Sequence, residues 1–222
     1  YHVPKKTEMS KHIKAEKVWY GFEPKADIRA IPLSTDPHLQ SAQIFYKQHE
    51  FTIFTRLLGK HNIENLLPAI ALSLDLGISK KTIIKAIEAL PQIEGKLSIH
   101  TGKRKSVIIN DAVNSNVEGF ISAIQTLQTF SQKKKIIVTQ GIIELGVEKR
   151  NSYERIIEEL EKTDIRLFTT DSLFKELLDE DRIQAFNDVS DIKKNLLSQL
   201  DKHTIILLEG KFPKTFIESV HM

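Results

Sequence analysis

The chain has 222 residues, no cysteine and a formal net charge of +3, from 32 basic and 29 acidic residues. Without cysteine it holds no disulfide, thiolate metal site or cysteine nucleophile, which fits a cytoplasmic protein. The balanced charge argues against a nucleic-acid partner. The longest nearly apolar run, residues 66–78, is too short to span a membrane, so no membrane partner is expected.

Short β-favouring segments dominate the first part of the chain. Strands are expected at residues 18–20, 26–31, 42–46 and 51–55. A strong helix is expected at residues 62–76, where apolar side chains recur at helical spacing until Gly77. Ser79 is expected to cap a second helix, residues 80–90, which Pro91 ends.

From Gly95 onward, apolar strands alternate with amphipathic helices. The expected strands are 96–100, 106–109, 135–139, 165–169 and 204–208, and the expected helices are 117–130, 152–162, 171–179, 188–200 and 213–220. This alternation predicts an α/β domain with a mostly parallel sheet that helices cover on both faces. We place the domain boundary between residues 93 and 94.

Several familiar catalytic motifs are missing from the sequence. Each of the four Gly-Lys pairs lacks the Ser or Thr that follows in a P-loop, so no P-loop is present. No Gly-x-Gly-x-x-Gly fingerprint occurs either. The eight histidines are scattered, and we interpret His100 and His203 as structural residues.

Four polar segments follow apolar ones: residues 58–65, 108–116, 138–146 and 207–211. The first offers donors and acceptors to a planar ligand at a helix start, or Asn62 merely caps the helix. The second ends a strand where α/β sheets bind ligands, or it is a turn in which Asn116 caps the next helix. The last two are weak alone and can be ordinary turns.

In order, these segments resemble the Mur ligases of peptidoglycan synthesis, and among them the branch that adds D-Ala-D-Ala. The family pattern is Gly-Arg/Lys-His-Asn-x-x-Asn, Gly-Arg-Leu, Asp-Asp-x-Tyr-Asn-x-Asn and Glu-Leu-Gly. The matching residues of this chain are 59–65, 95–97, 110–116 and 144–146. The resemblance runs from about Phe22 to the C-terminus and so covers most of the chain.

The resemblance implies two domains. Residues 1–93 would be the C-terminal portion of the central, ATP-binding domain, and residues 94–222 the Rossmann-like C-terminal domain. The P-loop, the magnesium-binding acid and the modified lysine of the family are expected upstream of Tyr1. A hinge is expected near residues 92–95.

The implied activity is ATP-dependent addition of D-Ala-D-Ala to UDP-MurNAc-tripeptide through an acyl phosphate, with ATP and Mg²⁺ as cofactors of a complete, monomeric enzyme. By the same resemblance the nucleotide-binding residues are His61, Asn62, Lys96 and Asp111, and the substrate-binding residues are Asn114, Asn116, Glu144 and Lys211. Neither a catalytic residue nor a metal ligand is expected within the chain, which alone should be inactive.

Some residues depart from the family pattern. Its arginine is Lys96, its first aspartate Asn110, its tyrosine Val113, and its late Lys-Gly-Ser-Arg is residues 209–212, Glu-Gly-Lys-Phe. These departures favour an alternative, a stand-alone module that binds nucleotide or muropeptide without catalysis. A third hypothesis is an α/β interaction protein whose N-terminal lysines contact an anionic partner: Lys5, Lys6, Lys11, Lys14 and Lys17.

Overall fold

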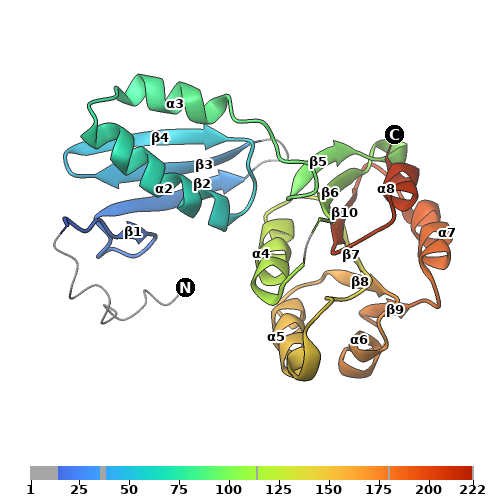
Figure 1. Ribbon diagram of the computed structural model, residues 1–222. Helices are drawn as coiled ribbons and strands as arrows, with labels where there is room; N and C mark the ends of the chain where they lie inside the picture. The colour runs from blue at the N-terminus through green and yellow to red at the C-terminus, as the bar shows by residue number, and fades with distance from the viewer. Residues whose placement is uncertain (1–14, 36–38, 114, 180, 222) are drawn as a thin grey trace.

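The computed structural model describes residues 15–35, 39–113, 115–179 and 181–221, and it contains two separate sheets (Figure 1). The N-terminal unit, residues 20–88, holds a four-stranded sheet, and the C-terminal unit, residues 98–220, holds a six-stranded sheet. The expected domain boundary falls in the segment that joins the units and stays a prediction. Four of the five N-terminal lysines lie outside the described residues.

The sheet of the N-terminal unit has its strands in chain order, antiparallel except for the first pair. They are β1 (Tyr20–Gly21), β2 (Ile28–Thr35), β3 (Gln40–Tyr46) and β4 (His49–Thr55). Helices α2 (Lys60–Asp75) and α3 (Lys80–Glu88) lie on one face of this sheet (Figure 1). Ile28, Ile44, Ile53, Ile63 and Leu67 are among the buried side chains between the two layers. Burial of this apolar surface is what holds helices and sheet together.

Most elements expected in this unit are confirmed. Ser79 is the N-cap of α3, since its side chain accepts a hydrogen bond from the Thr82 amide. The strand expected at residues 18–20 is instead Tyr20–Gly21, because pairing with β2 begins only at Tyr20.

The sheet of the C-terminal unit has the strand order β5-β6-β10-β7-β8-β9. All neighbours pair in parallel except β5 and β6. The strands are β5 (Ser98–Thr101), β6 (Val107–Asp111), β7 (Lys134–Thr139), β8 (Arg166–Thr169), β9 (Ile183–Ala185) and β10 (Thr204–Glu209). Because β10 lies between β6 and β7, the last strand of the chain is central.

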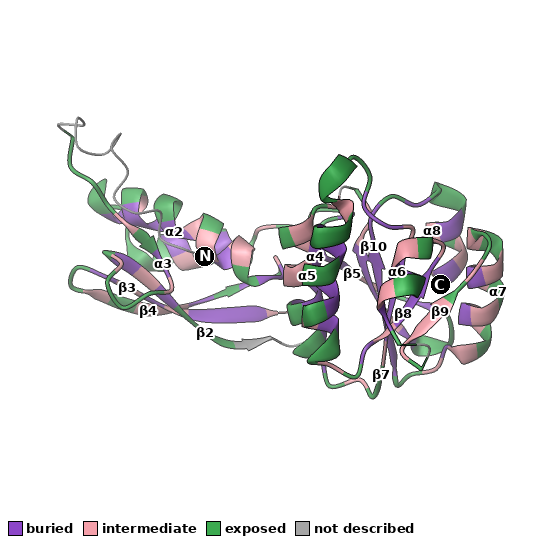
Figure 2. Cartoon of the chain, turned by 90° about the horizontal axis from the view of Figure 1, so that it is seen from below, coloured by how far each residue is buried: buried purple, intermediate pink, exposed green. Residues whose placement is uncertain are grey.

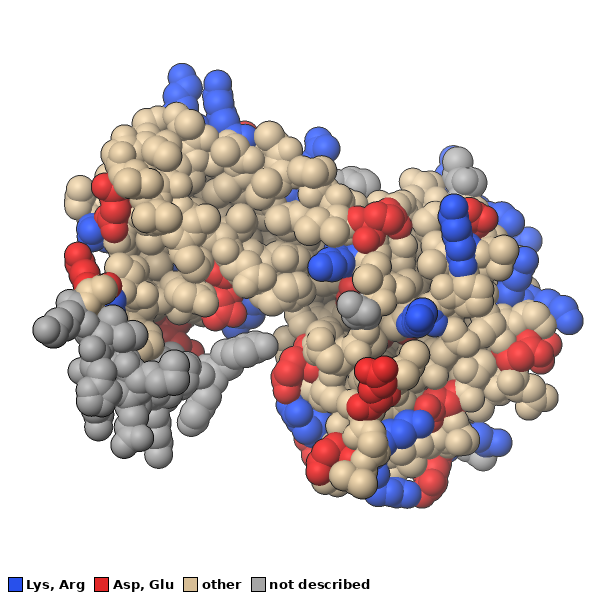
Figure 3. All heavy atoms as spheres, viewed as in Figure 1, with Lys and Arg blue, Asp and Glu red and all other residues tan. Residues whose placement is uncertain are grey.

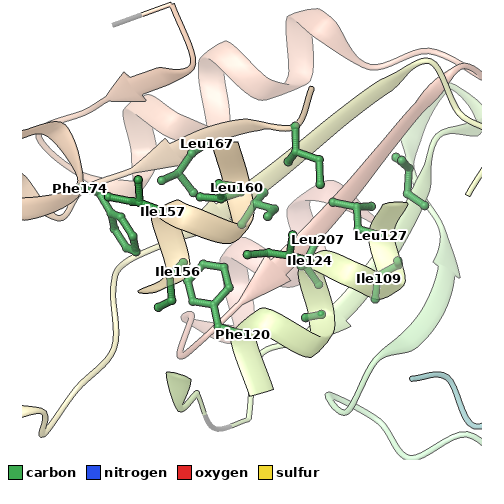
Figure 4. Packing of buried hydrophobic residues seen from close by; sticks show 14 of the residues in the cluster. Ile109, Phe120, Ile124, Leu127, Ile156, Ile157, Leu160, Leu167, Phe174 and Leu207 are labelled. Atoms are coloured by element: carbon green, nitrogen blue, oxygen red, sulfur yellow. The ribbon is translucent and has the colours of Figure 1, made fainter. Parts of the chain in front are cut away.

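Helices cover both faces of this sheet. Their bounds are α4 (Val117–Gln128), α5 (Lys149–Glu161), α6 (Ser172–Leu177), α7 (Val189–Gln199) and α8 (Lys214–Val220). Side chains of α4, α5 and α6 pack on one face, where Phe120, Ile156 and Phe174 meet (Figure 4). Side chains of α7 and α8 pack on the other. Figure 2 shows this burial on the inner sides of the helices. The expected mostly parallel α/β domain is confirmed.

Three details of the C-terminal unit differ from expectation. Strand β9 was not predicted, because it is three residues long and only partly buried. Short 3-10 turns occur at Lys103–Lys105 and Gly146–Glu148. Helix α5 begins at Lys149, earlier than the expected residue 152, because the second of these turns leads straight into it.

The surface carries charges of both signs. On the face shown in Figure 3, acidic and basic side chains are interspersed over the C-terminal unit. Among the described residues, no helix is long and apolar enough to cross a membrane.

Candidate functional site

The candidate site lies at the carboxyl ends of β6, β10 and β7. These strands end in register, with Glu209 paired to Asp111 on one side and to Thr139 on the other. Their side chains therefore share one face of the sheet at this edge. Ligands of open α/β sheets bind at such an edge, beside the place where strand order reverses.

Asp111 is held from two sides. The Leu97 amide donates to Asp111 Oδ1 at 3.2 Å, and the Gly210 amide donates to the Asp111 carbonyl oxygen at 3.2 Å. Burial raises the pKa of Asp111 to about 6, although the Leu97 amide and the charge of nearby Lys96 act in the opposite direction. Lys96 itself is exposed. An exposed cation thus stands beside a carboxylate at the strand ends.

The loop after β6 contributes Ser115 and Asn116. The Ser115 hydroxyl donates to Glu209 Oε1 at 2.6 Å. Asn116 is the N-cap of α4, and its Oδ1 accepts a hydrogen bond from the Gly119 amide at 2.8 Å. The capping alternative is therefore confirmed for Asn116, whose contact with substrate stays a prediction. Asn114 lies outside the described residues.

Two further predicted residues are exposed on the loops after β7 and β10. Glu144 lies in the first loop with a φ of 68°, and Lys211 lies in the second. The two loops touch, because Gln140 Nε2 donates to the Lys211 carbonyl oxygen at 2.6 Å. Lys211 is thereby placed next to the β7 loop that leads to Glu144.

Tyr153 of α5 fixes the start of the β7 loop, and it was not predicted as a site residue. Its hydroxyl accepts from the Ile142 amide at 2.9 Å and donates to Asp171 Oδ2 at 3.0 Å. A Cβ at Gly141 would lie 2.4 Å from that hydroxyl oxygen, so only glycine fits there. The apolar helix pattern signals that Tyr153 is buried, but not that its hydroxyl supports this loop.

The first turn of α2 holds the other two predicted nucleotide-binding residues. His61 Nδ1 lies 3.1 Å from Ser122 Oγ on α4, and burial lowers the pKa of His61. Asn62 Nδ2 donates to the Leu58 carbonyl oxygen at 2.6 Å. The hypothesis that Asn62 caps α2 is wrong. The N-cap residue of α2 is Gly59, and no side-chain hydrogen bond caps the helix there.

This turn meets the segment that carries Lys96. A Cβ at Gly59 would lie 2.9 Å from Leu97 Cδ1, and Leu58 is buried in the same apolar cluster as Leu97. Leu97 in turn contacts Asp111 through its amide. Residues from both units, far apart in sequence, therefore converge on one place.

Asn110 belongs to a separate polar cluster on the opposite face of β6. Its Nδ2 donates to Glu94 Oε1 at 2.6 Å, and His100 Nε2 lies 3.1 Å from Glu94 Oε2. The His100 ring stacks on that of His221 with centroids 4.6 Å apart. The structural interpretation of His100 thus agrees with its contacts. Strand alternation was the available signal that Asn110 and Asp111 face opposite sides.

No group of three or more His, Asp or Glu side chains in the described ranges is arranged to hold a metal ion. The described site presents amide, hydroxyl, ammonium and carboxyl groups, which suit a polar ligand with hydroxyl and phosphate groups.

The C-terminal unit is a mostly parallel α/β unit with polar loops at its strand ends, and the start of α2 in the N-terminal unit lies at the same edge. This arrangement is typical of a nucleotide- or substrate-binding enzyme domain. Two family models match this chain, the Mur ligase middle domain over residues 2–73 and the Mur ligase, glutamate ligase domain over residues 97–212. The chain belongs to the Mur ligase family.

Curated relatives include two UDP-N-acetylmuramoyl-tripeptide–D-alanyl-D-alanine ligases. The one from Buchnera aphidicola is 26% identical over 191 residues, which are 85% of this chain and 41% of the relative. The one from Borreliella burgdorferi is 29% identical over 180 residues, which are 80% of this chain and 37% of the relative. A Listeria monocytogenes UDP-N-acetylmuramoyl-L-alanyl-D-glutamate–2,6-diaminopimelate ligase is 26% identical over 131 residues, 59% of this chain and 26% of the relative. The chain thus spans less than half the length of these relatives.

Solved structures show the same fold. The MurF ligase from Thermotoga maritima in complex with ADP aligns with a TM-score of 0.76 and 20% identity, over 91% of this chain and 47% of that one. MurF from Acinetobacter baumannii aligns with a TM-score of 0.75 and 21% identity, over 90% and 44%.

Proposed function

We propose that this chain forms part of an ATP-dependent amide ligase of peptidoglycan precursor synthesis, which adds D-Ala-D-Ala to UDP-MurNAc-tripeptide. The observation that carries the proposal is the convergence of the Gly59–Asn62 turn with the Lys96–Asp111 edge, in a member of the Mur ligase family. ATP and Mg²⁺ are the proposed cofactors of the complete enzyme, which we expect to be a cytoplasmic monomer.

In this proposal the chain binds the nucleotide at the joint between its units. The amide of Asn62 can both donate and accept, so it suits an adenine edge. Lys96 is exposed and free to approach phosphates, where its positive charge offsets theirs. Asp111 accepts from a ribose hydroxyl or orients Lys96. His61 supports this arrangement through its contact with α4.

The second substrate is proposed to bind at the loops after β6, β7 and β10. There Asn114, Asn116, Glu144 and Lys211 would receive the incoming dipeptide. ATP supplies the phosphoryl group that activates the tripeptide carboxylate, and the dipeptide amine then displaces phosphate. The residues of this chain contribute by holding the reactants in place, which lowers the entropic barrier of such reactions.

Binding of ADP to the purified chain tests the nucleotide part of the proposal. We expect Lys96→Ala to weaken binding by about tenfold or more, because a charge-assisted contact contributes roughly 1.5–3 kcal/mol. Lys103→Ala removes an exposed lysine in the β5–β6 turn and is the matched control, with unchanged affinity. Isothermal titration calorimetry measures both. Equal affinities for the two variants would contradict the proposed role of Lys96.

A second candidate is a binding module without ligase activity. It is favoured by Asn110, which turns toward Glu94 and away from the edge, and by Val113, which is 47% exposed where the family has tyrosine. In a pure binding module, the combined changes Lys96→Arg, Asn110→Asp and Val113→Tyr leave function unchanged. In a ligase the same three changes raise turnover of the complete enzyme.

A further inference from the structure

Glu209, at the end of the central strand β10, is the most enclosed charged side chain of the candidate site. It is 1% exposed. Its Oε1 accepts the hydrogen bond from Ser115, whereas its Oε2 is buried and has no hydrogen-bond partner among the described side chains and amides. A buried ionised carboxylate with one oxygen unsatisfied is strongly unfavourable.

Among the residues that the structure describes, the neighbours of Glu209 do not supply a compensating cation. From β6 it faces Asp111, which is in register with it, and from β7 it faces the uncharged Thr139. From the start of α4 it receives only the Ser115 hydroxyl. The charge of Lys96 acts on Asp111, the other member of the pair.

Two adjacent carboxyl groups in such surroundings do not both ionise, because desolvation and mutual repulsion each favour the neutral form. Burial and the Asp111 charge raise the pKa of Glu209 well above its ordinary value. Burial also raises the pKa of Asp111, to about 6, while the Leu97 amide stabilises its charged form. Glu209 Oε2, by contrast, has no donor among the described residues. We therefore assign the proton mainly to Glu209 and the charge to Asp111.

We propose that Asp111 and Glu209 form a carboxyl pair that holds one proton at neutral pH, and that Glu209 is a positioning residue that donates this proton to Asp111 and so fixes the Asp111 carboxylate at the strand ends. The shared proton rests on the in-register placement of the pair, the burial of Glu209 and its unpartnered Oε2. Its effect on a ligand rests on the nucleotide site proposed above.

The pair has a consequence for nucleotide binding. While it holds one proton it carries a single negative charge, which Lys96 can offset. Loss of that proton adds a second negative charge beside the proposed phosphate site. ADP affinity should therefore fall as pH rises through this second ionisation, and Glu209→Gln should remove the fall, because glutamine keeps the shape and a donor but cannot ionise.

Carboxyl carbon NMR of the wild-type chain tests the shared proton without any ligand. We expect the Glu209 carboxyl to remain protonated at neutral pH and to titrate well above the ordinary range of a glutamate carboxyl. Finding both Asp111 and Glu209 fully ionised at neutral pH would overturn the proposal, and this measurement stands even if Glu209→Gln does not fold.

The pH profile of ADP binding then tests the positioning role. Wild type and Glu158→Gln, a control at an exposed position of α5, should lose affinity together at high pH. Glu209→Gln should keep its affinity over that part of the pH range. Identical profiles for all three would reject the positioning role. A protonated pair in a chain that does not bind ADP would instead reject the nucleotide site and leave the shared proton standing.

Discussion

Two carboxyl groups at opposite ends of β10 show how the surroundings of a side chain set its pKa in this protein. Asp201, before the strand, accepts hydrogen bonds from Lys134, the His203 amide and Thr204, and these lower its pKa to about 2. Glu209, at the other end, is buried beside a second acid, which raises its pKa. The sheet thus separates a permanently charged end from an end that can exchange a proton.

The raised pKa values predict a pH-dependent stability. A carboxyl whose pKa is raised by folding binds more protons in the folded state, so its contribution is lost as pH rises through the folded pKa. Between about pH 5 and 8 the free energy of unfolding should fall more steeply for wild type than for Glu209→Gln. Urea unfolding at several pH values measures this difference. Parallel curves for the two proteins would contradict it.

At the scale of single elements, hydrogen-bonded caps define where several helices begin. Ser79, Asn116, Asp171 and Asp188 each accept a backbone hydrogen bond at the start of the helix that follows. For α4 the residue before the cap, Ser115, also donates a hydrogen bond to Glu209. The cap of α4 therefore lies next to the candidate site in the chain.

Replacing Asn116 by Ala should destabilise the protein by about 1 kcal/mol, because the Gly119 amide loses its acceptor. Gln128→Ala, an exposed change at the other end of α4, should cost far less. Chemical denaturation measures both. An effect of Asn116→Ala no larger than that of Gln128→Ala would show that the cap contributes little.

Elements of this kind could be predicted because their signals are local. In the N-terminal unit, apolar periodicity predicted the first helix, Gly77 its end and Ser79 the start of the second. In the C-terminal unit, the alternation of strands and helices predicted the parallel sheet. The site was predictable only in part. The meeting of Gly59 with Leu97 depends on tertiary packing, and the contact of Glu209 with Asp111 depends on β10 entering the sheet between β6 and β7.

At the scale of the whole molecule, Leu58 joins the two units. It precedes α2 of the N-terminal unit, yet it is 1% exposed within the apolar cluster of the C-terminal unit, beside Leu97 and Phe120. His61 adds a polar contact to α4 at the same joint. Leu58 and His61 therefore help to place the start of α2 relative to the strand ends.

Truncating Leu58 should weaken this joint. Leu58→Ala is expected to cost about 2–5 kcal/mol, the range for buried leucines. Leu72→Ala makes the same change on the exposed side of α2, where Leu72 is 61% exposed, and should have little effect. Thermal and urea unfolding compare the two. Equal stability of both variants would show that Leu58 does not hold the units together.

The chain by itself is not expected to catalyse ligation, since its sequence contains no P-loop to hold the ATP phosphates. A ligation assay with the purified chain, ATP, UDP-MurNAc-tripeptide and D-Ala-D-Ala tests this. Detectable product would contradict the expectation and would require a phosphate-binding element of another kind within these residues.

Mapping ADP on the isotope-labelled chain by NMR tests the central claim most directly, namely that both units contribute to one nucleotide site. The account predicts that ADP shifts the amide signals of residues 59–62 together with those of residues 96–97 and 111, while those of β8 and β9 stay in place. Shifts confined to one unit, or centred on β8 and β9, would contradict it.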